Sequence, residues 1–431
     1  MTIFYVRTYC YSFMWAKENG GFILNNLFLS MYSMDKLYGD GIQDDYSAIQ
    51  AMLDSGRSEI YLPAPKNHYC ISKALKLHSN QTLRLGETTT VKLLPNSNCF
   101  MLTNAEVDAH DIAVVGGIWD FNNKEQEANP IKTRKRFEGP THVDGNPDTF
   151  VSYTEDYRGS VFNFYSVTRL TIRDLTIKDP VTYCVEMAYI KYFTVENVNF
   201  DQNLGNPTAE NMDGIHVDGG CQYGCIRNVQ GSCYDDVVAL NADDGFDGPI
   251  QDIQIDGVFG CHSLRGVRLL STKSPLERIS ISNVFGTFYQ NGISLSYYYP
   301  RSGNRGKMSH ITIRNIYGSN APRIPEYNKG DNSHYDYSFV WVDGTLDIDF
   351  LSIDNLFRKE EIGRVETLKV CADTRIKTLS LSNIVYENKT GAPMPMFVNE
   401  GFIAKLYLYN VDAGEDKLLL NKGEIYTVKE N

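Results

Sequence analysis

The sequence has neither an excess of positive charge nor a long apolar segment. Lysine and arginine total 41 against 53 aspartates and glutamates, which gives a formal net charge of −12. Clustered basic side chains supply most of the affinity of proteins for nucleic acid, so this balance argues against a nucleic-acid partner. No stretch approaches about 18 uninterrupted apolar residues, and we therefore expect no segment that spans a membrane.

The cysteines form neither a disulfide framework nor a metal site. There are nine, and Cys221 and Cys225 are followed by no second pair and no histidine at zinc-finger spacing. We therefore expect no metal and no cofactor, and interpret most thiols as small buried apolar groups in a reducing compartment. A signal peptide is not recognisable, because Arg7, Lys17 and Glu18 interrupt the apolar runs, which favours a cytoplasmic location.

Helical periodicity is also scarce, which argues against helical and leucine-rich solenoids. Instead, a four-residue pattern returns nine times from residue 170 onward: an aliphatic residue, two polar positions and a second aliphatic residue. The copies begin 23 to 40 residues apart, at Ile172, Val195, Ile226, Ile255, Ile281, Ile313, Ile353, Leu381 and Leu408. Such spacing is typical of a solenoid, whose coils each pack on their neighbours.

The third position of the pattern identifies the kind of solenoid. It is asparagine in seven copies, glycine in one and aspartate in one. These residues tolerate a left-handed backbone, so each coil is expected to run as a strand, a sharp bend and another strand. The sequence therefore predicts an all-β fold, a right-handed parallel β-helix with one continuous core. The stacked asparagines are interpreted as a structural hydrogen-bond ladder.

The segment before the repeat predicts a capped beginning. Gly39-Asp40-Gly41 indicates a turn, and Asp44 or Asp45 suits a helix N-cap. An apolar stripe at helical spacing follows and ends before Gly56; it consists of Ala48, Ile49, Met52 and Leu53. We expect this helix to cover the open end of the first coil. Residues 1–34 are then an extension of uncertain order, and residues 35–431 form the β-helix domain.

Short strands and one long loop are expected in the first coils. The strands are predicted at Glu59–Leu62, Leu75–Leu77, Thr82–Leu85 and Ile112–Val115. The polar, charge-rich stretch 124–156 is predicted to be a loop that walls a groove.

Two neighbouring coils carry an unusual density of acids. Asp213 and Asp235 are 22 residues apart, one short coil, so they are expected at equivalent positions about 4.8 Å apart along the stack. Asp236 should point elsewhere because side chains alternate along a strand. His216 should face outward beside Asp213. Any one of these acids suits a turn at a strand end, but three clustered like charges favour a functional site.

Such a set of acids matches the needs of glycoside hydrolysis. One carboxylic acid protonates the leaving oxygen and one carboxylate activates water, at a separation of about 6.5–9.5 Å in inverting enzymes. Crowding of like charges also raises one pKa and keeps that acid protonated.

These residues resemble glycoside hydrolase family 28, the polygalacturonase-like enzymes of the pectin-lyase-like superfamily. That family carries Asn-Thr-Asp and then Asp-Asp, to which Asn211-Met212-Asp213 and Asp235-Asp236 are similar. Gly116-Gly117-Ile118-Trp119-Asp120 resembles its glycine-rich coil before the site. The resemblance implies an inverting hydrolase of a poly- or oligosaccharide, with Asp235 as general acid and with Asp213 and Asp236 activating water.

The family's later motifs are only partly present. Gly-His-Gly is absent, and Cys261-His262-Ser263 is the nearest candidate. Gly266-Val267-Arg268-Leu269-Leu270 resembles the Arg-Ile-Lys coil that holds a uronate carboxylate, but Leu270 stands where the lysine is expected. The predicted substrate-binding residues are Asn211, His216, His262, Arg265, Arg268, Lys273 and Tyr299.

Two other functions fit the predicted fold. A polysaccharide lyase abstracts the proton beside a uronate, and Arg265, Arg268 and Lys273 keep this possible. Its Ca²⁺ ligands would be Asp243, Asp244 and Asp247. A non-catalytic carbohydrate-binding solenoid would have a groove with aromatic side chains and no dependence on Asp235. A lyase leaves a product that absorbs ultraviolet light, whereas a hydrolase does not.

Overall fold

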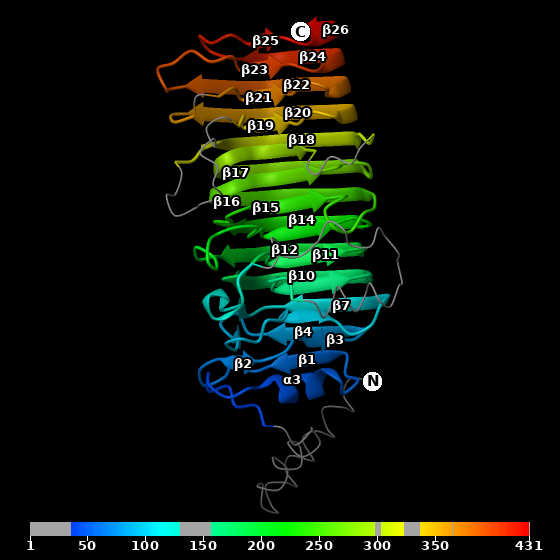
Figure 1. The fold of residues 1–431 in the computed structure, drawn as a ribbon, viewed down its shortest axis with the longest axis vertical. Helices are drawn as coiled ribbons and strands as arrows, with labels where there is room; N and C mark the ends of the chain where they lie inside the picture. Colours follow the sequence, from blue (N-terminus) through cyan, green and yellow to red (C-terminus); the bar gives the residue numbers. More distant parts are fainter. Residues whose placement is uncertain (1–35, 130–156, 298–302, 323–336, 364, 431) are drawn as a thin grey trace, which may run out of the picture.

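The computed structural model describes residues 36–129, 157–297, 303–322, 337–363 and 365–430. Parallel strands stack along one axis into a tall column, with a helix at the N-terminal end and β26 (Glu424–Glu430) at the other (Figure 1). This is a right-handed parallel β-helix, which confirms the fold predicted from the repeat. The expected extension, residues 1–34, lies outside the described residues.

The strands form three stacks, each with parallel register. The longest stack contains β1 (Glu59–Leu62), β4 (Gln81–Leu85), β7 (Ala109–Val115), β10 (Val167–Lys178), β12 (Lys191–Asp201), β14 (Gln222–Gly231), β16 (Ile250–Leu270), β17 (Pro275–Ser296), β18 (Gly306–Asn320), β20 (Leu346–Glu360), β22 (Arg375–Asn388), β24 (Phe402–Asp412) and β26. A short stack contains β2 (Tyr69–Ile71), β5 (Thr90–Leu93) and β8 (Ile118–Asp120), and it continues into the second half of β10.

The third stack carries the acids singled out by the sequence. It contains β3 (Leu75–Leu77), β6 (Leu102–Asn104), β9 (Phe162–Tyr165), β11 (Val185–Ala188), β13 (Ile215–Asp218), β15 (Asp236–Asn241), β19 (Val340–Val342), β21 (Leu368–Val370), β23 (Phe397–Asn399) and β25 (Leu419–Asn421). The ends of β16 and β17 complete it between β15 and β19. Two predicted strands match, and β4 and β7 begin one and three residues earlier than expected.

The left-handed bends lie where the repeat places them. All nine third-position residues have positive φ, from 50° at Asn228 to 85° at Gly257. Side-chain amides join successive coils, as in the bond of 3.0 Å from Asn315 Nδ2 to Asn283 Oδ1. At Gly257, which has no side chain, Asp256 Oδ1 accepts the bond from Asn283 instead. The predicted asparagine ladder is therefore confirmed.

A second column of left-handed residues was not predicted. Its members have φ between 55° and 65°, and they are Asp111, Arg169, Tyr192, Tyr223, Asp252, Arg278 and His310. Consecutive members pair across coils. Arg169 and Arg278 bind Asp111 and Asp252 with two hydrogen bonds each, and the rings of Tyr192 and Tyr223 stack 4.9 Å apart. Arginine and tyrosine seldom adopt such a backbone, and the residue type changes from coil to coil, so no single-residue pattern indicated this bend.

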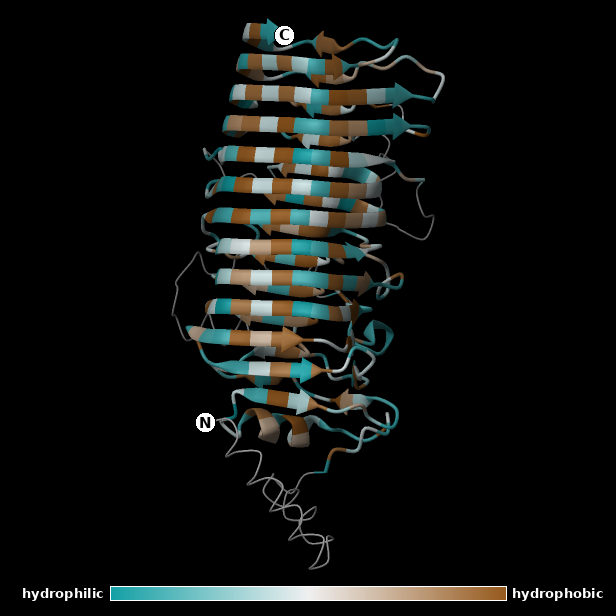
Figure 2. Cartoon of the chain, turned by 180° about the vertical axis from the view of Figure 1, so that it is seen from behind, coloured by the Kyte–Doolittle hydropathy of each residue, from teal (hydrophilic) through white to brown (hydrophobic). Residues whose placement is uncertain are grey.

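One core runs through the whole column. Apolar and polar residues alternate along the long strands, which puts a continuous apolar lining inside the coils (Figure 2). The helix α3 (Tyr46–Leu53) covers the first coil with Ile49 and Leu53, as expected. Asp45 occupies its N-cap position, but the Asp45 carboxylate binds the backbone N–H groups of Tyr38, Gly39 and Cys70 rather than those of the helix.

The structure also bears on the expected burial of the thiols and on the expected absence of a membrane span. All eight described cysteines are free, and four of them are buried: Cys70, Cys184, Cys221 and Cys233. The interpretation of most thiols as buried is thus right for half of them. Within the described ranges, no helix has the length and apolar character needed to cross a bilayer.

Candidate active site

The site lies where the third stack begins its strands in the middle of the column. Asp213 lies two residues before β13, Asp236 is the first residue of β15, and Arg265 pairs with Asp236 in the register of β15 and β16. Parallel stacking places these starts side by side, so residues from three coils meet.

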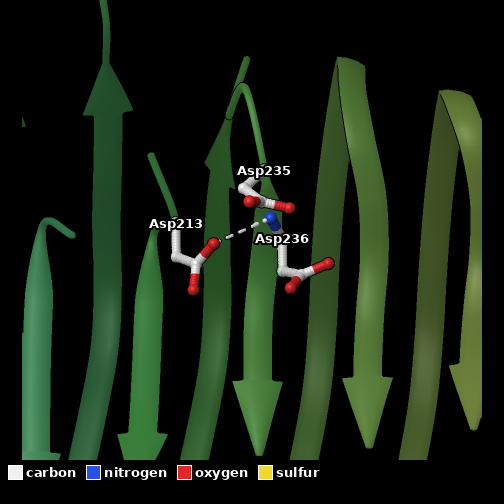
Figure 3. Close-up of side chains that lie close together, drawn as sticks. All are labelled: Asp213, Asp235 and Asp236. Atoms are coloured by element: carbon white, nitrogen blue, oxygen red, sulfur yellow. Dashed lines mark hydrogen bonds between the residues drawn. The ribbon is translucent and has the colours of Figure 1, made fainter. Parts of the chain in front are cut away.

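Asp213, Asp235 and Asp236, the acid cluster, converge as the sequence suggested (Figure 3). One carboxylate oxygen from each lies within 4.8 Å of the others. The backbone N–H of Asp236 donates to Asp213 Oδ1 at 3.1 Å. All three residues are buried, with exposures of 1%, 4% and 0% in sequence order. Three carboxylates held this closely away from water need compensating charge.

The register of the cluster differs from the prediction by one residue. Ile215 pairs with Val238, an offset of 23, so Asp213 lies beside Asp236 rather than Asp235. Asp236 also does not point elsewhere, as strict alternation required. Val237 and Val238 both belong to the core, which shows that alternation is broken at the start of β15.

Two arginines supply the compensating charge. Arg265 Nη1 lies 3.0 Å from Asp235 Oδ1 and 3.2 Å from Asp236 Oδ1. Arg268 Nε lies 2.9 Å from Asp236 Oδ2, and its Nη2 lies 3.7 Å from Asp244 Oδ2. Burial works against the charge of Arg268, but the carboxylates of Asp236, Asp213 and Asp235 together outweigh it and raise the pKa of the guanidinium. The two predicted arginines, Arg265 and Arg268, therefore lie at the site and pair with aspartates of the chain itself.

His216 is a buried member of the site rather than an outward-facing side chain. Its Nδ1 lies 2.6 Å from Asp213 Oδ2 and its Nε2 lies 3.4 Å from Asp218 Oδ1. The ring of Tyr183 stacks on it at 3.9 Å. Burial lowers the pKa of His216, but the charges of Asp218 and Asp213 outweigh this and raise it to about 10. A protonated imidazole thus bridges two carboxylates.

Asp213 has the altered acidity that acid–base chemistry needs. Burial first, and then the charge of Asp235, raises the pKa of Asp213 to about 6, although the hydrogen bond to His216 lowers it. A carboxyl group with such a pKa can hold or release a proton near neutrality.

The other predicted binding residues are not all at the cluster. Asn211, which has φ of 53°, accepts a hydrogen bond of 3.3 Å from Asn129 Nδ2. His262 is exposed and lies across from Tyr289, with ring centroids 6.3 Å apart, and among the described residues no hydrogen bond or ion pair joins it to the acids. Lys273 Nζ binds Asp247 at 2.6 Å. Tyr299 lies outside the described residues.

The predicted wall over residues 124–156 is described only at its beginning. The backbone N–H of Asn129 donates to the carbonyl of Asn206, and its side chain reaches Glu210 and Asn211. This beginning therefore contacts the segment that leads to Asp213. The rest of the stretch, from residue 130, lies outside the described residues.

The acids proposed for Ca²⁺ in the lyase alternative have other partners. Asp243 Oδ2 accepts three backbone N–H groups, from Thr272, Lys273 and Ser274, at 2.7 to 2.9 Å. Asp247 binds Lys273, and Asp244 lies beside Arg268. Over the described ranges, the acids close enough to share a metal are those of the acid cluster itself, where Arg265 and Arg268 already pair with Asp235 and Asp236. We therefore assign no metal site.

Sequence reasoning missed three residues around the cluster. Asp218 lies two positions after His216, so alternation along β13 could have placed both on one face. Asn241 pairs with Asp218 in the register, and its Nδ2 approaches His216 Nε2 at 3.3 Å. Tyr183, the cover of His216, has no sequence signal because it comes from a turn before β11.

Comparisons with known proteins give the fold and leave the family open. No family model matches the chain, and no curated protein matches it either. Among solved structures, endo-xylogalacturonan hydrolase from Aspergillus tubingensis has a TM-score of 0.56 at 14% identity, covering 90% of this chain and 98% of its own.

Two further structures show that one fold serves different functions. A family 28 exopolygalacturonase of Yersinia enterocolitica has a TM-score of 0.54 at 14% identity, covering 88% of this chain and 77% of its own. A surface adhesin of Streptococcus pneumoniae has a TM-score of 0.52 at 16% identity, covering 85% and 90%. At such identities the likeness extends to the fold alone. The chain is a right-handed parallel β-helix of the kind found in polygalacturonases and in an adhesin.

Proposed function

We propose that the chain is a polygalacturonase-like glycoside hydrolase that cleaves a poly- or oligosaccharide at the acid cluster. The observation that carries this proposal is the convergence of Asp213, Asp235 and Asp236 within 4.8 Å. Buried like charges are costly, and such clusters occur where acid–base chemistry needs them. Two neighbours of the same fold are named as hydrolases of galacturonan-type polymers, which supports the same chemistry.

In this proposal, Asp235 is the general acid, and Asp213 and Asp236 orient the attacking water. Asp235 is the most exposed of the three, and Arg265 fixes its carboxylate from one side. Asp213, with its pKa of about 6, is the competing candidate for the acid. A substrate with a good leaving group no longer needs the general acid. The two assignments therefore differ in which variant, at Asp235 or at Asp213, still turns over such a substrate.

Inversion of the anomeric centre belongs to the proposal and is open to direct test. The oxygens of the cluster lie within 4.8 Å, closer than the separation of about 6.5–9.5 Å that is usual between the carboxyl groups of inverting enzymes. Proton NMR of the first product decides the point: the anomer opposite to the substrate supports inversion, and the same anomer contradicts it.

The first experiment measures new reducing ends from a panel of polysaccharides and oligosaccharides, together with absorbance of unsaturated uronates. Reducing ends without that absorbance establish a hydrolase. Reducing ends with the absorbance establish a lyase, the less favoured alternative because Asp243 and Asp247 do not converge on a Ca²⁺ site. The variant to be assayed beside the unmodified chain is Asp235→Asn. Its matched control is Asp111→Asn, the same change at a more exposed carboxylate bound to Arg169.

A non-catalytic glycan-binding function is the second candidate. The observation in its favour is that none of the three carboxylates exceeds 4% exposure, and an adhesin shares the fold. This candidate expects binding of a glycan that persists in Asp235→Asn, with no reducing ends from either protein. The hydrolase proposal expects turnover by the unmodified chain and its loss in that variant.

A further inference from the structure

The cationic groups at the acid cluster are already bound by the chain's own carboxylates. Contacts of 2.6 to 3.9 Å connect eight side chains into one network. Its carboxylates are Asp213, Asp218, Asp235, Asp236 and Asp244, and its cations are His216, Arg265 and Arg268. Five carboxylates face three cations, so the fully ionised network carries two excess negative charges.

The neighbouring lysine does not change this balance. Lys273 Nζ binds Asp247 at 2.6 Å, and Asp243 lies against the backbone of the same turn. These residues add two carboxylates and one cation to the surroundings. An incoming carboxylate would therefore meet a net negative charge at this site.

Beside this network lies a row of different chemistry. Asp218, Asn241 and Leu270 are in register on β13, β15 and β16. Leu270 is fully buried but belongs to none of the three hydrophobic clusters of the described residues, unlike its neighbour Leu269. Because side chains alternate along a strand, Leu270 points away from the core, on the same face as Arg268 two residues before it.

Asn241 adds an unused hydrogen-bond acceptor to that row. Its Nδ2 donates to Asp244 Oδ2 at 3.3 Å and also lies 3.3 Å from His216 Nε2. Its Oδ1 is buried and accepts no hydrogen bond from the described residues. A buried acceptor of this kind calls for a donor, and a sugar hydroxyl supplies one.

We propose that this site takes a neutral glycan and rejects uronate polymers. The inference rests on the proposed function and specifies its substrate class. Hydroxyl groups would donate to Asn241 Oδ1 and to the carboxylates of the acid cluster. A free carboxylate has no donor hydrogen to offer, and every cation in the network already has an acidic partner.

The test compares polymers that differ only in charge. Polygalacturonate, alginate and hyaluronan are each paired with their carboxyl-reduced forms, and xylan, mannan and glucan complete the panel. Affinity electrophoresis of the full chain measures binding apart from cleavage, and reducing-end release measures turnover. The expected result is retardation by at least one neutral polymer, with binding about tenfold weaker or more for its charged partner.

Each outcome decides something. Equal or stronger binding of a uronate form overturns the inference, and so does failure of every neutral polymer to retard the chain. Retardation by a neutral polymer without reducing ends leaves the inference standing and contradicts the hydrolase proposal. Reducing ends from a uronate form alone confirm the hydrolase and overturn the inference.

A charge variant sharpens the test. Asp244→Asn keeps the shape of the side chain but removes one of the two carboxylates beside Arg268. We expect the ratio of uronate to neutral binding to rise severalfold, while the control Asp111→Asn leaves the ratio unchanged. An unchanged ratio in Asp244→Asn would show that charge in the network does not set the preference.

Discussion

The asparagine ladder and the acid cluster are two polar columns built on the same stacking, with opposite designs. In the ladder, each coil repeats one residue type, and Asn315 donates to Asn283 and accepts from Asn355. In the cluster, successive coils bring an aspartate, another aspartate and an arginine to one place. In the ladder, most side-chain amides bond to the same residue type on a neighbouring coil. In the cluster, the residue type changes from coil to coil, and charged groups gather at one place. The difference separates what holds the column together from what does chemistry.

The largest effect is expected from removing the general acid. Asp235→Asn should reduce turnover of an ordinary glycan about 10²–10⁴-fold, because a carboxamide does not protonate the leaving oxygen. The fold should persist, since the substitution is nearly isosteric and Arg265 keeps Asp236 as a partner at 3.2 Å. Steady-state rates on glycans and on an aryl glycoside with an acidic leaving group measure this.

The aryl glycoside also decides between the two acids. Recovery of its turnover in Asp235→Asn, but not in Asp213→Asn, supports the proposed roles. The reverse pattern would assign the proton to Asp213, in keeping with its pKa of about 6.

Loss of a buried arginine should be the largest effect on stability. Arg268→Leu leaves Asp236 without the guanidinium 2.9 Å away, at 0% exposure. Breaking one side of a buried ion pair typically costs about 3–5 kcal/mol. Urea unfolding followed by circular dichroism measures the loss. The comparison is Arg278→Leu in the second bend, where Arg278 is half exposed and its partner Asp252 is partly exposed, so this loss should leave stability nearly unchanged.

The charge of His216 should make stability depend on pH. Its pKa is raised to about 10 in the folded chain from an ordinary value near 6.5, so the folded state keeps a proton that the unfolded state releases in that interval. The stabilisation is complete below about pH 6.5 and is lost as the pH rises toward 10. Urea midpoints between pH 6 and 10 should fall more steeply for the unmodified chain than for His216→Gln, and equal slopes would contradict the bridge between Asp213 and Asp218.

The smallest effect is expected in the ladder. Asn315→Ala removes two side-chain bonds and puts alanine at a φ of 57°, which together should cost about 1–3 kcal/mol. Asn315→Gly loses the bonds but keeps the bend. Its free energy of unfolding in urea should therefore lie between those of the unmodified chain and Asn315→Ala. Turnover should stay unchanged in both. An alanine variant as stable as the unmodified chain would show that the ladder follows the bends without stabilising them.

The sequence predicted what repetition encodes and missed what single contacts decide. The third position of the pattern, asparagine in most copies, revealed the nine bends of the ladder, because one backbone conformation favours one kind of residue. The second column of bends escaped, because its residue type changes from coil to coil. The density of acids indicated the cluster. The one-residue offset of Asp213 and Asp236 escaped, because it depends on the broken alternation at Val237 and Val238. Pairing of Arg265 and Arg268 with carboxylates also depends on three-dimensional contacts that local patterns do not contain.

The second bend also makes the coils different from one another. Its residues come in complementary couples: Asp111 with Arg169, Tyr192 with Tyr223, and Asp252 with Arg278. Excision of the single coil that contains Tyr223 would bring Tyr192 against Asp252. The ring of Tyr192 would then contact a carboxylate in place of the ring of Tyr223. The column is therefore not a string of interchangeable units, because removal of one coil separates the members of a couple.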